Sequence, residues 1–313
     1  MIKEFIHRQQ FWIFYVLALF IAMGAAFWMF TFAPMDIAQI FDEAQKNLGI
    51  NHFSVFVPLS LTFKYPLLAP AILFPAAPTV AGLIMIWYTT RKKGLHLFFS
   101  RFKPWRDGVE RKDALKTYGI ILAGALAYLG ILLAYNAFIS GGEAFQISLA
   151  NLRVDAPLLM VFFFVLAAFF DCGGLLEEGG WRGYALPYLQ GKMKTPLAAA
   201  VLLGILWGVW HFPRDIPYIT SYGEYFVQQL NFILGTTLHT IILAYFFNRL
   251  GGSLIPVIVI HGLSNYIGDM IGHNHTIFLQ FDVLNLLKLV IVLVIIWLAG
   301  AGLGLRKCLQ EQP

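Results

Sequence analysis

The feature that most constrains this chain is a series of long apolar runs. A run of about 20 apolar residues is long enough to cross the hydrocarbon core of a bilayer as a helix. A helix also satisfies its own backbone hydrogen bonds, which a segment surrounded by lipid must do. Eight runs of this kind occur, at residues 11–33, 66–90, 115–139, 156–176, 196–212, 226–247, 254–271 and 283–305. The sequence therefore predicts an all-α, polytopic membrane protein with about eight transmembrane helices.

The composition excludes an ordinary soluble domain. Hydrophobic residues make up 59% of the chain and charged residues only 12%, with a mean hydropathy of +0.71. Soluble domains carry about 25% charged residues. The excess of basic residues does not indicate nucleic-acid binding, because the longest basic stretch, residues 91–116, joins two predicted spans. We therefore expect membrane lipids, and no nucleic acid, as partners.

The distribution of lysine and arginine predicts the orientation of the helices. If both termini lie in the cytoplasm, seventeen basic residues fall in inner segments and four in outer segments. This bias follows the positive-inside rule. We expect an integral membrane protein with cytoplasmic termini, in the plasma membrane of a prokaryote. The sequence leaves the oligomeric state open.

Two connections are long enough to have structure of their own. The outer one, residues 35–64, has mixed polarity and is predicted to be partly helical around residues 37–48. The inner one, residues 91–116, carries four aromatic side chains that we expect to rest in the lipid interface: Phe98, Phe99, Phe102 and Trp105.

Polar side chains within or beside the predicted spans gather in three clusters. An ionisable side chain costs about 2.5–3.5 kcal/mol to insert at the centre of a bilayer, so intramembrane charges are functional candidates by default. The clusters are Glu177 and Glu178 with Arg182, Trp207 with His211, and His261 with Asn265. In each cluster two members are four residues apart, a spacing that places side chains on one face of a helix.

The clusters are predicted to meet in one buried polar cavity. A turn is expected at residues 191–195, where glycine, two lysines and threonine precede a proline. Glu178 lies 16 residues before Lys194 and His211 lies 17 residues after it. The two side chains therefore reach similar heights on opposite arms of a hairpin.

Other residues near the clusters have secondary roles in this interpretation. Asp171 and Asp269 are candidates to extend the cavity, whereas His239 is assigned to helix packing. Glycines close to the clusters are predicted to allow close helix approach: Gly179, Gly180, Gly262 and Gly268.

In their order along the chain, the three motifs resemble those of the CPBP family, the CAAX proteases and bacteriocin-processing enzymes. The motifs are E-E-x-x-x-R, an aromatic residue followed by x-x-x-His, and His-x-x-x-Asn, and the resemblance covers residues 156–269. The aromatic position, often Phe in the family, is Trp207 here. The resemblance implies a catalytic core at residues 156–272. The apolar runs on either side predict an N-terminal three-helix membrane region with a basic cytoplasmic loop (1–155) and a C-terminal transmembrane helix with a tail (273–313).

Similarity to the type II CAAX prenyl endopeptidases implies an intramembrane endopeptidase acting on a membrane-associated or lipidated peptide. A glutamate and His211 would activate water, and His261 with Asn265 would stabilise the oxyanion. The family pattern favours Glu177 over Glu178 as the base, a choice that helical phase alone cannot make.

The remaining two motif residues have supporting roles in this interpretation. Arg182 would keep one of the paired carboxylates charged, and Trp207 would contact the substrate.

A metal ion remains an open alternative. Glu177, His211 and His261 could hold zinc, and the family was first described as metal-dependent. However, the sequence has no H-E-x-x-H pair, and asparagine is a poor zinc ligand. The favoured interpretation is a glutamate-type hydrolase that requires no cofactor.

Each cluster also has a purely structural interpretation. The acidic pair with Arg182 could be an ion pair at a helix end, and both histidine motifs could be polar contacts between membrane helices. The same residues would suit an ion or proton relay in a transporter, although no repeated, interrupted helices support this. A non-hydrolytic immunity factor is a third alternative, and nothing in the sequence identifies the substrate.

Overall fold

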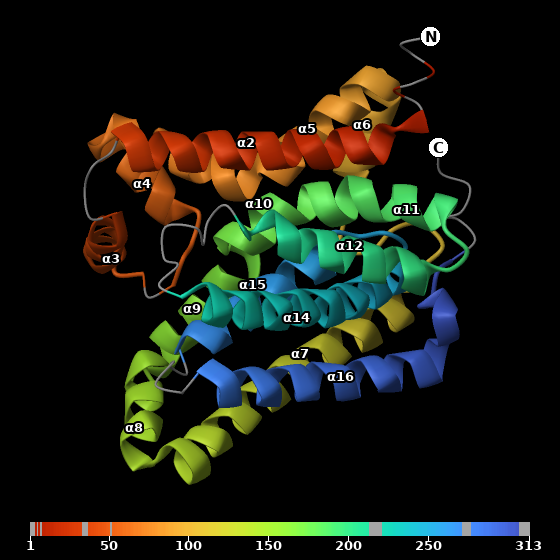
Figure 1. The fold of residues 1–313 in the computed structure, drawn as a ribbon. Coiled ribbons are helices and arrows are strands. Elements are labelled where there is room, and N and C mark those ends of the chain that lie inside the picture. Colours follow the sequence, from red (N-terminus) through yellow and green to blue (C-terminus); the bar gives the residue numbers. More distant parts are fainter. Residues whose placement is uncertain are drawn as a thin grey trace.

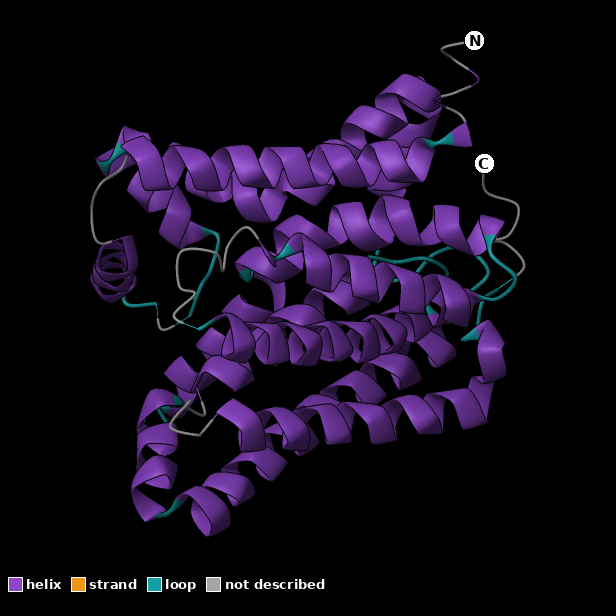
Figure 2. Ribbon diagram, in the orientation of Figure 1, coloured by secondary structure: helices purple, strands orange, loops and turns teal. Residues whose placement is uncertain are grey.

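The computed structural model describes residues 4–306, apart from residues 5, 7, 33–36, 51, 213–220 and 271–276. The described part of the chain forms helices and no β-strand longer than an isolated bridge (Figure 2), which confirms the predicted all-α class. The first and last residues, whose cytoplasmic placement was predicted, lie outside this set.

The main helical elements follow one another along the chain with short connections. They are α2 (Gln10–Phe32), α3 (Ile37–Leu48), α4 (Phe56–Lys64), η1 (Pro66–Ile72), α5 (Leu73–Thr89), α6 (Arg91–Ser100), α7 (Arg111–Tyr135), η2 (Asn136–Ser140), α8 (Gly142–Asn151), α9 (Pro157–Phe170), α10 (Cys172–Gly180), η3 (Trp181–Ala185), α11 (Leu186–Lys192), α12 (Pro196–Trp210), α14 (Tyr222–Arg249), α15 (Ile255–Met270), α16 (Ile277–Ala299) and η5 (Gly300–Gly302).

Five helical segments in the described residues are long and apolar enough to cross a membrane. They are Gln10–Phe32, Pro66–Thr89, Arg111–Ser140, Tyr222–Arg249 and Leu284–Gly302. The other three predicted spans are also helical, but α9 and α12 are shorter apolar helices, and α15 has 16 residues.

The polar motifs come from the middle of the bundle (Figure 1). Helices α2 and α5 pack together along one edge, α10, α12, α14 and α15 occupy the centre, and α7 and α16 lie toward the opposite edge. Large apolar side chains such as Phe20, Phe138, Leu158 and Trp297 are exposed on the outside of the bundle. Such a surface suits contact with lipid rather than water.

The predicted span at 156–176 is not one continuous helix, which corrects the sequence-based prediction. Helix α9 ends at Phe170, and α10 starts at Cys172 after an extended residue, Asp171, with φ −58° and ψ 138°. The Asp171 carboxylate accepts a hydrogen bond from the amide of Gly174, as expected of an N-cap. A capping residue, followed by Cys172 and then two glycines, therefore begins a new helix within an apolar run.

A hydroxyl from α5 interrupts the hydrogen bonding of α10. Thr79 Oγ1 donates to the carbonyl of Leu176 and accepts from the amide of Gly180 at 3.0 Å. It thus stands between two backbone groups that would pair in an uninterrupted helix. The next five residues, Trp181–Ala185, form a π-helical turn, and a side chain inserted into the helical ladder is one known cause of such irregularity.

Three of the four predicted glycines do allow close approach of helices. A Cβ at Gly180 would overlap the backbone of Pro78, one at Gly262 would overlap the carbonyl of Ala167, and one at Gly179 would lie 2.6 Å from the Thr79 hydroxyl. Gly268 differs, since the nearest neighbour of a Cβ there would be 3.9 Å away. The close contacts place α10 against α5, and α15 against α9.

The predicted turn at 191–195 is present. Helix α11 ends at Lys192, and Thr195 caps α12 by accepting from the amide of Ala198.

The connection at residues 91–116 is partly docked on protein, which corrects the expectation for Phe98. This side chain is buried, and its ring lies beside Gly179 and Gly183, whose missing side chains leave room for it. Phe99 and Phe102 are exposed.

Candidate active site

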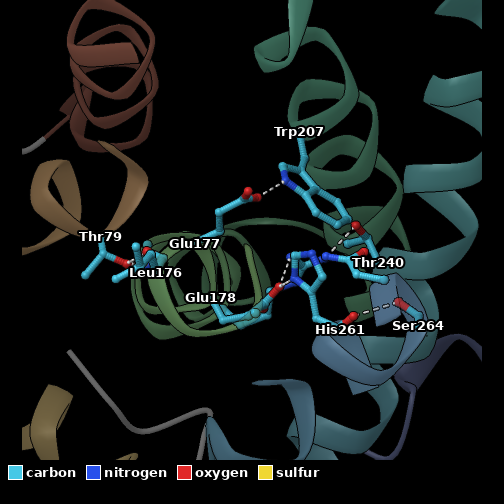
Figure 3. A network of polar contacts seen from close by, with 12 residues as sticks. Thr79, Leu176, Glu177, Glu178, Trp207, Thr240, His261 and Ser264 are labelled. Atoms are coloured by element: carbon cyan, nitrogen blue, oxygen red, sulfur yellow. Dashed lines mark hydrogen bonds and ion pairs between the residues drawn. The ribbon is translucent and has the colours of Figure 1, made fainter. Parts of the chain in front are cut away.

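Glu178 lies at the centre of a buried ion-pair network. Its Oε1 atom accepts from Arg182 Nη1 at 2.8 Å and lies 2.7 Å from Nδ1 of His261 (Figure 3). Arg182 also donates through Nη2 to the hydroxyl of Thr240 at 2.8 Å. Glu178, Arg182 and Thr240 have no exposed surface. The network therefore joins α10 and the following π-helical turn to α14 and α15.

Glu177 points to a different neighbour from Glu178 (Figure 3). Its Oε2 atom accepts a hydrogen bond of 2.8 Å from the indole Nε1 of Trp207. Among the described residues, its second oxygen, Oε1, has no hydrogen-bond partner. The structure therefore distinguishes two carboxylates that are adjacent in sequence. Glu178 is fully buried, with Oε1 in both ion pairs and Oε2 enclosed without a partner, whereas Glu177 keeps 6% of its surface exposed.

Trp207 connects the motif residues to one another. The Arg182 guanidinium lies 4.5 Å from the indole centroid, in a cation–π contact. The His261 ring packs edge-on at 5.3 Å between centroids, and the His211 ring lies at 5.7 Å. Trp207, which the sequence interpretation assigned to substrate contact, thus packs among the motif residues and donates a hydrogen bond to Glu177.

His211 ends α12 rather than lying within it. Its ring nitrogen Nδ1 is 2.8 Å from the carbonyl of Trp207, one turn earlier, and the ring packs edge-on against Phe232 of α14. A histidine held at Nδ1 presents its opposite nitrogen, Nε2, away from its own backbone.

His261 and Asn265 converge at Gly173, the second residue of α10. A Cβ built at Gly173 would lie 3.0 Å from His261 Nε2 and 3.3 Å from Asn265 Nδ2. Both nitrogens therefore reach the same small volume, which only a glycine leaves open. Because Nδ1 of His261 already contacts Glu178, its Nε2 is the nitrogen that faces this volume.

Two side chains that the sequence interpretation placed outside the site belong to its surroundings. His239 of α14, assigned to packing, lies 6.0 Å from the ring of Trp207 and 5.8 Å from that of His261. Thr240, which accepts a hydrogen bond from Arg182, lies outside the three sequence motifs. The sequence could have indicated His239, because it is an ionisable residue inside an apolar helix. It could not have indicated Thr240, because the contact with Arg182 depends on how the helices pack.

Glu177, His211 and His261, the possible zinc ligands of the open alternative, are not arranged around one point in the described structure. Within the part of the chain that the structure describes, no group of three or more His, Cys, Asp or Glu side chains is arranged to hold an ion. His261 uses Nδ1 for Glu178, and Glu177 is bonded to an indole. A zinc site needs several N, O or S donors directed at one point.

The fold and this site define a class: a helical membrane protein with a buried Glu–Arg–His network where several helices meet. Residues 155–267 match a family model described as type II CAAX prenyl endopeptidase Rce1-like. This region of the chain is therefore similar to the CAAX protease family, in agreement with the resemblance of its three motifs.

A curated relative supports the same assignment. CAAX prenyl protease 2 of Methanococcus maripaludis is 32% identical over 157 residues, which cover 48% of this chain and 55% of the relative. The chain thus spans about half the length of the curated relative that it matches.

Proposed function

We propose that this protein is an intramembrane endopeptidase in which Glu177 is the general base. The observation that carries the proposal is the different environment of the two glutamates. Glu178 is held by Arg182 and His261 and has no exposed surface, whereas Glu177 makes no ion pair, has one oxygen bound to Trp207 and is 6% exposed. A base must have an oxygen within reach of the water that it deprotonates.

The reaction begins with a water molecule placed between Glu177 and His211. Glu177 takes one proton from this water while the oxygen attacks the carbonyl carbon of the scissile peptide bond. His211 makes a second hydrogen bond with the same water through its Nε2 atom. Glu177 then passes its proton to the leaving amine, so that the carboxylate is regenerated when the C–N bond breaks.

The negative charge of the tetrahedral intermediate falls on the former carbonyl oxygen. His261 Nε2 and Asn265 Nδ2 converge on one small volume beside Gly173, which suits them to donate hydrogen bonds to this oxygen. In its doubly protonated form His261 has hydrogens on both ring nitrogens, and Glu178 balances the charge of that form. Arg182 and Thr240 hold Glu178 in place.

We propose a membrane-associated peptide as the substrate. The apolar exterior and the five helices long and apolar enough to span a membrane support a substrate at the membrane, and the matched relative is named a CAAX prenyl protease. A CAAX sequence consists of the last four residues of a chain: a cysteine, which carries the prenyl group, and the three residues that follow it. By extension, we infer that a lipidated C-terminal peptide is the first substrate to test.

A cleavage assay in proteoliposomes tests this proposal. The substrates are a farnesylated CAAX peptide and the same peptide without the lipid, incubated with the wild type, Glu177→Ala and His211→Ala. We expect cleavage by the wild type and a loss of at least about 100-fold in both variants. Glu110→Gln, at an exposed position outside the site, is the control and should cleave normally.

Several results would contradict the proposal. Cleavage that survives in both variants would remove the proposed mechanism. Ion flux through the proteoliposomes without cleavage would favour the relay instead. Activity that is lost on chelation and restored by zinc would overturn the glutamate-type mechanism.

A further inference from the structure

The break between α9 and α10 contains a buried carboxylate that the reaction above does not use. Asp171 is 3% exposed and lies within hydrogen-bond distance of a motif residue on another helix. We propose that Asp171 is a positioning residue that orients the amide of Asn265 toward the oxyanion. This inference rests on the proposed endopeptidase function.

One oxygen of Asp171 makes both of its hydrogen bonds. Oδ1 accepts from the amide of Gly174 at 2.7 Å and from Nδ2 of Asn265 at 3.1 Å. The first bond starts α10, and the second joins α10 to α15. The same atom therefore fixes the start of α10, which carries both glutamates. It also holds the side chain of Asn265 on α15.

The contact determines which end of the Asn265 amide faces the reacting volume. An asparagine amide has two donor hydrogens on nitrogen and an acceptor oxygen, and its orientation follows from its hydrogen-bond partners. A carboxylate can only accept, so it holds the nitrogen on its own side. The second hydrogen of Nδ2 is then free for the volume beside Gly173, 3.3 Å away. A flipped amide would present oxygen to the oxyanion and repel it.

A short outer segment, residues 53–55, holds the break in its extended form. The amide of Cys172 donates to the carbonyl of Phe53 at 3.0 Å, and the amide of Val55 donates to the carbonyl of Phe170 at 2.9 Å. The hydroxyl of Ser54 donates to the same Phe170 carbonyl at 3.0 Å. The backbone groups released by the break are thus paired across an antiparallel bridge.

Close packing prevents Asp171 from moving. A Cβ at Gly262 of α15 would lie 2.9 Å from the Cβ of Asp171. The absence of a side chain at Gly262 lets α15 approach until Asn265, three residues later, reaches the carboxylate. The geometry is therefore built by α9, α10, α15 and the outer segment together.

Helix capping alone could explain a buried aspartate, so the experiment separates the two roles. Serine caps helices about as well as aspartate. Its side chain is shorter, so its oxygen lies farther from Asn265 and cannot hold the amide. Asparagine at position 171 keeps an oxygen for Gly174 and hence for Asn265. The variants are Asp171→Ser, Asp171→Asn, Asn265→Ala and the double variant Asp171→Ser/Asn265→Ala, each in the full-length protein in proteoliposomes with the farnesylated peptide.

We expect kcat of Asp171→Ser to fall about tenfold to 100-fold with KM changed less than about threefold, because loss of one oxyanion donor acts on the transition state. Asp171→Asn should retain activity within about fivefold. The double variant should equal Asn265→Ala, because the two residues act as a unit. If the serine variant does not fold, Asp171→Thr replaces it with the same expectations.

Wild-type kcat in Asp171→Ser would overturn the proposal. A further loss in the double variant, equal to that in the single one, would also overturn it, because Asp171 would then act independently of Asn265. These outcomes are separate from failure of the proposed function, which would appear as no cleavage by the wild type or full cleavage by Glu177→Ala. Asp113→Asn, at an exposed position in α7, should leave the kinetics unchanged.

Discussion

At the scale of single residues, the two adjacent glutamates have different environments because they point in different directions from α10. Neighbouring positions on a helix are about 100° apart, so Glu177 faces α12 and Glu178 faces α15 (Figure 3). The sequence motif contains both carboxylates but does not state this division. The roles of the two side chains can therefore be tested separately.

Replacing Trp207 by phenylalanine tests whether the indole positions Glu177. Phe keeps the ring but removes the N–H that donates to Oε2 at 2.8 Å. We expect kcat to fall about tenfold, because a hydrogen bond to a charged group is worth about 1.5–3 kcal/mol, and KM to change little. The measurement is steady-state cleavage of the farnesylated peptide.

The matched control is Trp210→Phe. It removes an indole hydrogen bond of 3.3 Å to the carbonyl of Ala18, away from the glutamates, and should leave kcat unchanged. Equal kinetics for Trp207→Phe and the wild type would show that the indole N–H has no role in catalysis.

Replacing Glu178 by glutamine is predicted to affect stability as well as activity. The change leaves the Arg182 guanidinium buried without its anionic partner. Loss of one member of a buried ion pair costs about 3–5 kcal/mol. We therefore expect a lower thermal midpoint in detergent for Glu178→Gln, whereas Glu177→Gln should lose activity with little loss of stability. The reverse pattern would contradict the roles assigned to the two glutamates.

At the scale of helices, the site depends on contacts that α10 makes with its neighbours. The hydroxyl of Thr79 on α5 stands between Leu176 and Gly180, which flank the two glutamates. The three motif helices are thus held in register by residues that lie outside the motifs, including some on α5 and α14.

Thr79→Val tests this contact. Valine has the same shape but cannot pair with the carbonyl and amide of α10, so these groups either remain unpaired or form the direct helical bond and turn the glutamates. We expect a loss of about 1–3 kcal/mol in unfolding free energy and at least about a tenfold drop in kcat. The control is Thr89→Val on the same helix, whose hydroxyl bonds only to Met85 of its own turn. Thr79→Val with wild-type kinetics would show that the insertion does not position the glutamates.

At the scale of the whole molecule, the bias of basic residues predicts which side of the membrane each loop faces. In a Cys308→Ser background, we introduce Asp107→Cys in the inner loop and Asn47→Cys in α3, both at exposed positions. A membrane-impermeant maleimide should label the first only in inverted vesicles and the second only from the outer side. Labelling of both from one side would exclude the predicted topology.

Much of the architecture could be predicted from the sequence because it depends on local pattern. Apolar runs predicted every helix of the core, the residues around Thr195 predicted the turn between α11 and α12, and mixed polarity predicted α3 with its observed bounds. The break at Asp171 was missed because both halves of the run are apolar. Phe98 was misplaced because the space that receives it is created by glycines on another helix.

The sequence by itself determined that this chain is a helical membrane protein with motifs similar to those of the CAAX protease family, because hydropathy and the ordered motifs are local properties. Only the tertiary structure decided which glutamate meets Trp207 and which meets His261, and that His239, Thr240 and Asp171 join them. The physical reason is that a contact between helices depends on their relative rotation and separation. Those quantities are set by packing across the bundle and are not encoded in the spacing within any one helix.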